Sequence, residues 1–148
     1  MGRSQGGFGT KVHVVCDGQG RPLGVLLTPG QRHESVVFEA VLDTVRVPQK
    51  GRPARRRPQR VAGDMAYNNQ RIRGWLRARR IGAVIPRPKN QRRRRFDRER
   101  YRGRNVVERL IGWLKERRQL ATRFEKLAVN FLAMIKIAMT LWFLKKEL

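Results

Sequence analysis

The sequence predicts an α/β fold, and three observations lead to that prediction. Short apolar runs that alternate with polar residues or end at turn residues indicate strands. Other segments carry apolar residues every three or four positions, which indicates helices. The two patterns interleave along the chain, as is typical of α/β folds. At 148 residues the chain is long enough for a core of its own, so we expect residues 1–148 to form one domain.

The first elements are predicted to form an antiparallel hairpin. Residues Thr10–Cys16 alternate between two faces, which indicates a strand. Asp17 and Gly18 supply a turn, and Leu23–Thr28 reads as the returning strand before Pro29 ends it.

A helix and a basic loop are expected next. Ser35 is predicted to cap the helix, and Pro48 is predicted to stop it. The apolar residues at helical spacing are Phe38, Val41, Leu42 and Val45. Residues 50–60 are rich in arginine and proline, so they predict a surface loop.

A strand, a helix and a second strand follow. The predicted elements are Val61–Gly63, Gln70–Arg80 and Ala83–Ile85. Asp64 comes directly after the first strand, and α/β folds commonly place their chemistry at such strand ends. Asp64 is therefore the first candidate site residue.

The C-terminal third predicts another basic loop and two helices. The loop covers residues 87–96, after which Asp97 is predicted to cap a long helix reaching about Arg118. A second helix is expected from Thr122 towards Lys146. Its apolar part is interrupted by Lys136, which is costly in lipid, so we interpret it as a buried helix of a soluble protein and expect no membrane partner.

The charge of the chain points to a polyanionic partner. Thirty-five Lys and Arg against eleven Asp and Glu give a net charge of +24, which favours nucleic acid. The runs Arg55–Arg57 and Arg92, Arg93, Arg94 and Arg95 are interpreted as contacts to DNA phosphates without base specificity. The single Cys16 excludes an internal disulfide and any CxxC-type zinc site, and residues 1–9 hold no apolar secretory signal. We therefore expect a cytoplasmic, nucleoid-associated protein.

Four polar residues fall on one stripe of the predicted long helix. On a helical wheel Tyr101, Arg104, Glu108 and Lys115 lie within about 60° of one another, beside the apolar face. Two interpretations of Glu108 are open: an ion pair with Arg104, or a carboxylate that reaches into a cleft. If Glu108 and Asp64 converge, two carboxylates in a basic surround would suit Mg²⁺ or Mn²⁺. Two such ions about 3.5–4 Å apart are the usual means of phosphodiester chemistry.

The same four residues carry a family resemblance. Their types and spacing match the Y-(2)-R-(3)-E-(6)-K signature, so the chain resembles the DDE transposases of bacterial insertion sequences of the four and five type. Gly63-Asp64-Met65-Ala66-Tyr67 is similar to the family's second-aspartate motif. Thr28-Pro29-Gly30-Gln31 is similar to another of its blocks, and the similarity runs from about Gly6 to Leu144.

The resemblance implies a ribonuclease H-like catalytic domain with a mixed sheet flanked by helices. It implies that Asp64 and Glu108 are the second and third catalytic carboxylates and metal ligands, and that Tyr101, Arg104 and Lys115 hold DNA. The implied reaction is metal-dependent hydrolysis at the element ends followed by transfer of the 3′ ends to target DNA. The family works as dimers or larger synaptic complexes.

One family residue has no counterpart in this sequence. The first catalytic Asp lies on a central strand that precedes the one beginning near Thr10, residues 1–9 contain no acid, and Asp17 reads as a turn residue. We therefore expect an incomplete domain, poorly stable alone, that needs an upstream segment for the first Asp. Either a frameshifted gene or a decayed copy would explain it.

Other functions are compatible with the charge. A non-catalytic basic DNA-binding relic of a transposase gene is the main alternative, and an RNA-binding protein of ribosomal type leaves the polar stripe unexplained. His13 and His33 have no partner at metal-ligand spacing, and the three tryptophans lie among apolar neighbours, so these residues are interpreted as structural.

Overall fold

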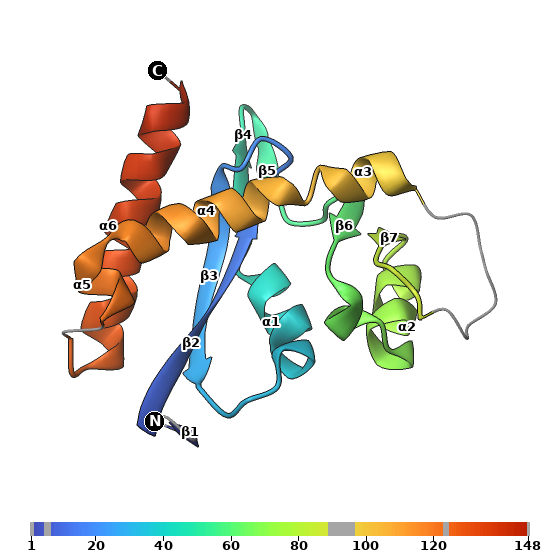
Figure 1. Cartoon of the computed structure of the whole chain (residues 1–148). Coiled ribbons are helices and arrows are strands. Elements are labelled where there is room, and N and C mark those ends of the chain that lie inside the picture. The colour runs from blue at the N-terminus through green and yellow to red at the C-terminus, as the bar shows by residue number, and fades with distance from the viewer. Residues whose placement is uncertain (1, 5–6, 89–96, 123–124, 148) are drawn as a thin grey trace.

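The computed structural model describes residues 2–4, 7–88, 97–122 and 125–147. Helices and strands are mixed along this part of the chain, so the predicted α/β class is confirmed at that level. The strands of the described residues form one three-stranded sheet and two two-stranded sheets. The longest strands run through the middle of the molecule, with helices on either side (Figure 1).

The predicted N-terminal hairpin is confirmed. Strand β2 (Gly7–Cys16) pairs antiparallel with β3 (Pro22–Pro29), and the short β1 (Gly2–Ser4) pairs with the start of β2. Asp17 holds the turn, because its Oδ1 accepts the backbone N–H of Arg21 at 2.9 Å and its Oδ2 accepts Arg21 Nε at 2.6 Å. These contacts hold the pKa of Asp17 below its usual value despite the opposing effect of burial, as fits a turn residue.

The next helix begins differently from the prediction. A 3₁₀ turn, η1 (Glu34–Val37), precedes α1 (Phe38–Asp43). The cap is His33, whose ring Nδ1 accepts the backbone N–H of Ser35, so the predicted cap at Ser35 is wrong. The Ser35 hydroxyl forms a second hydrogen bond with the same ring nitrogen, at 2.8 Å, and so helps to hold His33 in place at the start of the turn.

The first basic segment, residues 50–60, is largely exposed as predicted, but part of it is a strand. This strand, β5 (Arg52–Arg55), pairs antiparallel with β4 (Val47–Gln49), which lies just before the segment, and Gly51 lies in the turn between them. Gly51 has φ +67°, a value that glycine adopts without steric cost. The sequence pattern did not predict this hairpin, because β5 consists mainly of arginine and proline, is exposed along its whole length and has no apolar face.

The predicted strand, helix and second strand are confirmed within two residues. They are β6 (Arg60–Ala62), α2 (Gln70–Ala78) and β7 (Gly82–Val84), and a 3₁₀ turn, η2 (Met65–Tyr67), precedes the helix. The two strands are parallel, and the backbone N–H of Gly63 extends the ladder to the carbonyl of Val84.

The predicted long helix is broken in two. Asp97 caps α3 (Arg98–Arg102) by accepting the Arg100 N–H, as predicted, but a turn of i to i+3 hydrogen bonds then leads into α4 (Asn105–Glu116). The break falls at Gly103, a residue type that weakens helices. A further short helix, α5 (Arg118–Ala121), follows.

The C-terminal helix is only half-buried, so its interpretation as a buried helix is wrong. Helix α6 (Ala128–Glu147) packs one face inward while Val129, Ile137 and Leu141 are 69%, 62% and 53% exposed. Its apolar residues run all round the axis, but the described part of the chain covers only one side. By length and composition alone Ala128–Lys145 could cross a membrane, a property that core helices of soluble proteins share.

The hairpin separates two apolar cores. The first lies between β2–β3, α4 and α6, and the second between β2, α1 and the β6–α2–β7 unit (Figure 1). Val14 and Cys16 contact the first core and Val15 the second, as the alternation along β2 requires. The buried members of the first core are Val25, Leu110, Leu114, Phe131, Ile135, Ala138 and Met139. Those of the second are Phe38, Leu42, Ile72, Leu76, Ile81 and Ile85.

Gly24 in β3 tests the contact between the hairpin and α1. A Cβ at this position would collide with Oγ1 of Thr44, which donates a hydrogen bond to the Val41 carbonyl at 2.7 Å. We expect Gly24→Ala to lower the free energy of unfolding by about 1–3 kcal/mol, as other overpacked sites do. Gly18→Ala is the matched control, because nothing lies within 4 Å of its added Cβ. Equal unfolding midpoints in urea for the two variants would contradict this packing.

Candidate active site

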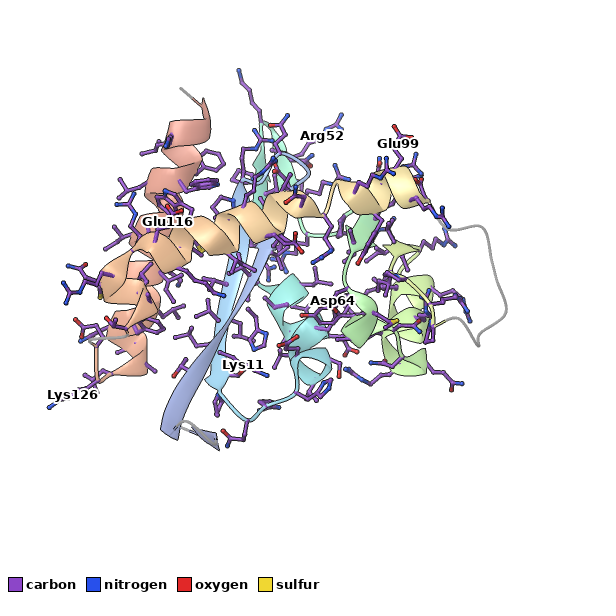
Figure 2. All side chains as sticks on the ribbon, in the orientation of Figure 1. Lys11, Arg52, Asp64, Glu99, Glu116 and Lys126 are labelled. Carbon is purple, nitrogen blue, oxygen red and sulfur yellow. The ribbon has the colours of Figure 1, made fainter. Side chains whose placement is uncertain are left out.

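Asp64 lies where β6 passes into η2 (Figure 2). Its Oδ1 accepts the backbone N–H of Ala66 at 2.9 Å, so one carboxylate oxygen caps the 3₁₀ turn. The backbone at Gly63 lies close to Tyr67, because a Cβ on Gly63 would stand 3.1 Å from the Tyr67 ring. Asp64 therefore follows the end of a strand, as predicted, but β6 is largely exposed and not buried as expected.

Tyr67 forms the apolar side of this corner. Its ring packs against Phe38 with centroids 5.3 Å apart. Burial raises the pKa of Tyr67 to about 12, and the negative charges of Glu34 and Asp64 add to the effect. Tyr67 is thus a protonated neighbour of Asp64 at neutral pH, and η1 brings Glu34 into the same surroundings. Tyr67 appears in the sequence only as the last residue of the motif around Asp64, and nothing in the spacing connects Glu34 to it.

Tyr101, Arg104 and Glu108 form a continuous row across the junction of α3 and α4. The guanidinium of Arg104 lies over the Tyr101 ring at 5.5 Å from its centroid, and its Nη2 donates to Oε1 of Glu108. The ion pair with Arg104 is one of the two interpretations left open for Glu108. The Glu108 side chain is 54% exposed and Arg104 is 24% exposed, so the pair is open to solvent.

The other predicted DNA contacts stand apart from this row. Lys115 is exposed near the end of α4, roughly two helical turns beyond Glu108. Arg55, Arg56 and Arg57 are exposed at the end of the β4–β5 hairpin and beyond it. Arg92–Arg95 lie outside the described residues.

The carboxylates offer a partial ligand set for a divalent cation. Within residues 2–4, 7–88, 97–122 and 125–147, no three His, Cys, Asp or Glu side chains form a group that could hold a metal. Asp64 and Glu108 each use one oxygen for a protein hydrogen bond, and in the described part of the chain the second oxygen of each has no partner. Carboxylate oxygens are ligands that Mg²⁺ and Mn²⁺ prefer, but among the described residues no hydrogen bond or ion pair links Asp64 to Glu108.

Three further polar or aromatic side chains contribute to packing and hydrogen bonding within the fold. His13 is buried and hydrogen-bonded to Oγ1 of Thr28 at 2.8 Å, and burial lowers its pKa. Burial raises the pKa of Cys16 to about 11, so at neutral pH it stays a thiol against the first core. Trp142 donates to the Gly20 carbonyl at 2.8 Å and packs on Trp113, which ties α6 to the hairpin turn.

Comparison with known sequences decides the family. The profile of the transposase DDE domain matches residues 2–143, which is nearly the whole chain. The chain belongs to the transposase DDE domain family. A protein of Burkholderia cepacia assigned by name as the transposase for insertion sequence element IS402 is 31% identical to it over 131 residues. That alignment covers 87% of this chain and 60% of the relative. No solved structure matches the chain.

Membership in the transposase family confirms the resemblance drawn from the Tyr101 to Lys115 spacing and from the Asp64 motif. DNA transposition, DNA binding and enzymatic activity are properties of this family of proteins. This transposase DDE domain spans 60% of the length of the relative that it matches.

Proposed function

We propose that this chain is the part of an insertion-sequence transposase that carries the second and third catalytic carboxylates, Asp64 and Glu108. The single observation that carries the proposal is Asp64 at the end of β6, in a parallel strand–helix–strand unit within a chain of the transposase DDE family. The reaction would be hydrolysis of phosphodiesters at element ends and transfer of the 3′ ends to target DNA, in the bacterial cytoplasm.

Each site residue has a role in this proposal. Asp64 and Glu108 would hold Mg²⁺ or Mn²⁺, which would activate the attacking oxygen and stabilise the leaving one. Arg104 would neutralise Glu108 before DNA arrives and then turn to a phosphate, because guanidinium and phosphate pair by two hydrogen bonds. Lys115 would add a point charge on the strand, and Tyr101 would support Arg104 through the ring contact.

The remaining carboxylate would come from polypeptide outside these 148 residues. In the described part of the chain residues 11–16 of β2 form ladder pairs with β3, and β6 forms ladder pairs with β7, so each strand has an open edge. A central strand between these edges, as in a ribonuclease H-like sheet, would satisfy both and carry the first Asp beside Asp64. Residues 1–148 would then be one incomplete domain that works in a dimer or a larger synaptic complex.

The test is metal-dependent nicking of labelled element-end DNA by the chain alone and by the chain joined to the sequence encoded upstream. We expect Mg²⁺-dependent nicking in the joined protein and its loss in Glu108→Gln, with DNA binding retained. Glu116→Gln is the control, since Glu116 is an exposed residue of the same helix (Figure 2). Salt-sensitive DNA binding without nicking in either form would overturn the catalytic proposal and favour a DNA-binding relic.

A further inference from the structure

The end of α2 holds an arginine where helices normally place glycine. The backbone N–H of Ile81 bonds the Leu76 carbonyl at 2.8 Å, and that of Arg80 bonds the Arg77 carbonyl at 2.9 Å. This pair of bonds is the Schellman ending, whose left-handed position is usually glycine. Here Arg80 occupies it with φ +54°, the only positive φ of a non-glycine residue among the described residues. Such strain is retained where the side chain has a use elsewhere in the fold.

The Arg80 side chain lines a basic cavity. The cavity has a volume of about 410 Å³ and lies between α2 and β7, which are neighbours at one side of the molecule (Figure 1). Arg73, Arg77, Arg80 and Arg87 line it, with Leu76 and Ile81 as apolar wall. No acidic side chain of the described residues lines it.

Arg73 is fixed in place at this cavity. Its Nε donates to Oδ1 of Asn68 at 2.6 Å, and its Nη2 donates to the Ile85 carbonyl at 2.9 Å. Burial lowers the pKa of Arg73, and the nearby charge of Arg87 lowers it further. Two guanidinium groups therefore stand close together, and the structure fixes one of them.

The described residues supply no counter-charge to the arginines of the cavity. Within the described ranges no carboxylate lies within ion-pair distance of Arg73, Arg77, Arg80 or Arg87. Neighbouring arginines differ: Arg71 pairs with Glu39 at 2.5 Å, and Arg79 lies over the Trp75 ring at 4.1 Å.

Stabilisation of the helix end does not account for this arrangement. Cations near a helix C-terminus interact favourably with its dipole, and Arg77 and Arg79 already supply that charge. Glycine at position 80 would form the same helix ending without strain. The Arg80 side chain therefore contributes to the lining of the cavity and is not needed for the helix ending.

We propose that this cavity is an oxyanion site that takes a phosphate group, with the exposed Arg77 and Arg80 as two of its clamps and the hydrogen-bonded Arg73 as the third. Planar guanidinium groups bind phosphate through paired hydrogen bonds, and several around one cavity suit a doubly contacted phosphodiester or a free phosphate ion. The DNA-bound form of the inference rests on the proposed transposase function, and it adds a backbone contact away from the carboxylates.

Arg80→Gly separates ligand binding from stability. We expect its thermal midpoint to be unchanged or higher, because glycine relieves the positive φ. We expect the rise in thermal midpoint caused by inorganic phosphate to shrink, and duplex DNA affinity to fall about tenfold. The slope of log affinity against log salt should lose about one unit. Arg79→Ala is the control, because it removes the same charge one residue away and Arg79 does not line the cavity.

Each outcome decides the inference. Equal phosphate and DNA binding by Arg80→Gly and Arg79→Ala would overturn it while leaving the transposase proposal intact. Loss of the phosphate response in Arg80→Gly with unaltered DNA binding would support the site with free phosphate as the ligand. Loss of both would support a phosphodiester. If neither the native chain nor the joined protein binds DNA, the transposase proposal fails and the phosphate response alone decides whether the cavity is an anion site.

Discussion

Replacing Asp64 by asparagine is expected to remove Mg²⁺-dependent nicking by the joined protein while leaving the fold intact. Asparagine caps helical turns as well as aspartate does, so the hydrogen bond from the Ala66 N–H is kept. It carries no charge to bind a divalent cation. A catalytic metal stabilises developing charge by several kcal/mol, so we expect the nicking rate to fall roughly 10²–10³-fold or more. The measurement is the initial nicking rate on labelled element-end DNA, with the thermal midpoint read in parallel.

Asp97→Asn is the matched control for that experiment. Asp97 caps α3 by accepting the Arg100 N–H at 3.0 Å, so the same atoms change in a comparable structural role. We expect the control to nick DNA at the native rate. If Asp64→Asn nicks as fast as Asp97→Asn, then Asp64 is only a capping residue and the proposed ligand set is wrong.

Truncation of Leu110 is expected to have the largest effect on stability. Leu110 is fully buried in the first core, where α4 meets β3 and α6. Leu→Ala changes at such positions cost about 2–5 kcal/mol, because apolar contacts are lost and a cavity remains. We expect the urea unfolding midpoint of Leu110→Ala to fall accordingly. The position of Glu108 depends on this packing, since the two residues share α4.

The neighbouring Arg109 provides the control for Leu110. Its side chain is exposed on a different face of α4, and exposed substitutions usually change stability by about 0.5 kcal/mol or less. A Leu110→Ala variant that unfolds at the same urea concentration as Arg109→Ala would show that α4 is not held by the first core.

The candidate site was predictable from the sequence in part. Asp64 was placed at a strand end from three apolar residues and a following helix pattern. Spacing alone predicted one stripe of Tyr101, Arg104, Glu108 and Lys115, of which the first three are in contact in the structure. The row survives the break at Gly103, because contacts between residues three and four apart are local and form in either kind of helical turn. The distance between Asp64 and Glu108 is set by tertiary packing, and no local pattern reports it.

The arginine cavity escaped prediction for the same reason. Arg73, Arg77, Arg80 and Arg87 come from a helix, its end and the segment after β7, and in the sequence they look like other arginines of a chain with net charge +24. Among these four residues the only unusual local feature is Arg80, which occupies the position after α2 where glycine is usual.

The sequence by itself determined the local elements of this protein: the β2–β3 hairpin, the β6–α2–β7 unit, the Asp97 cap and the family to which the chain belongs. These follow from turn chemistry, alternation and spacing, which act between residues close in the chain. Only the tertiary structure decided that β6 and β7 are parallel and that β5, within the first basic segment, pairs with β4. It also decided that α6 buries only one face of its apolar surface. These features depend on which surfaces meet, because a side chain is buried only where another part of the chain packs against it.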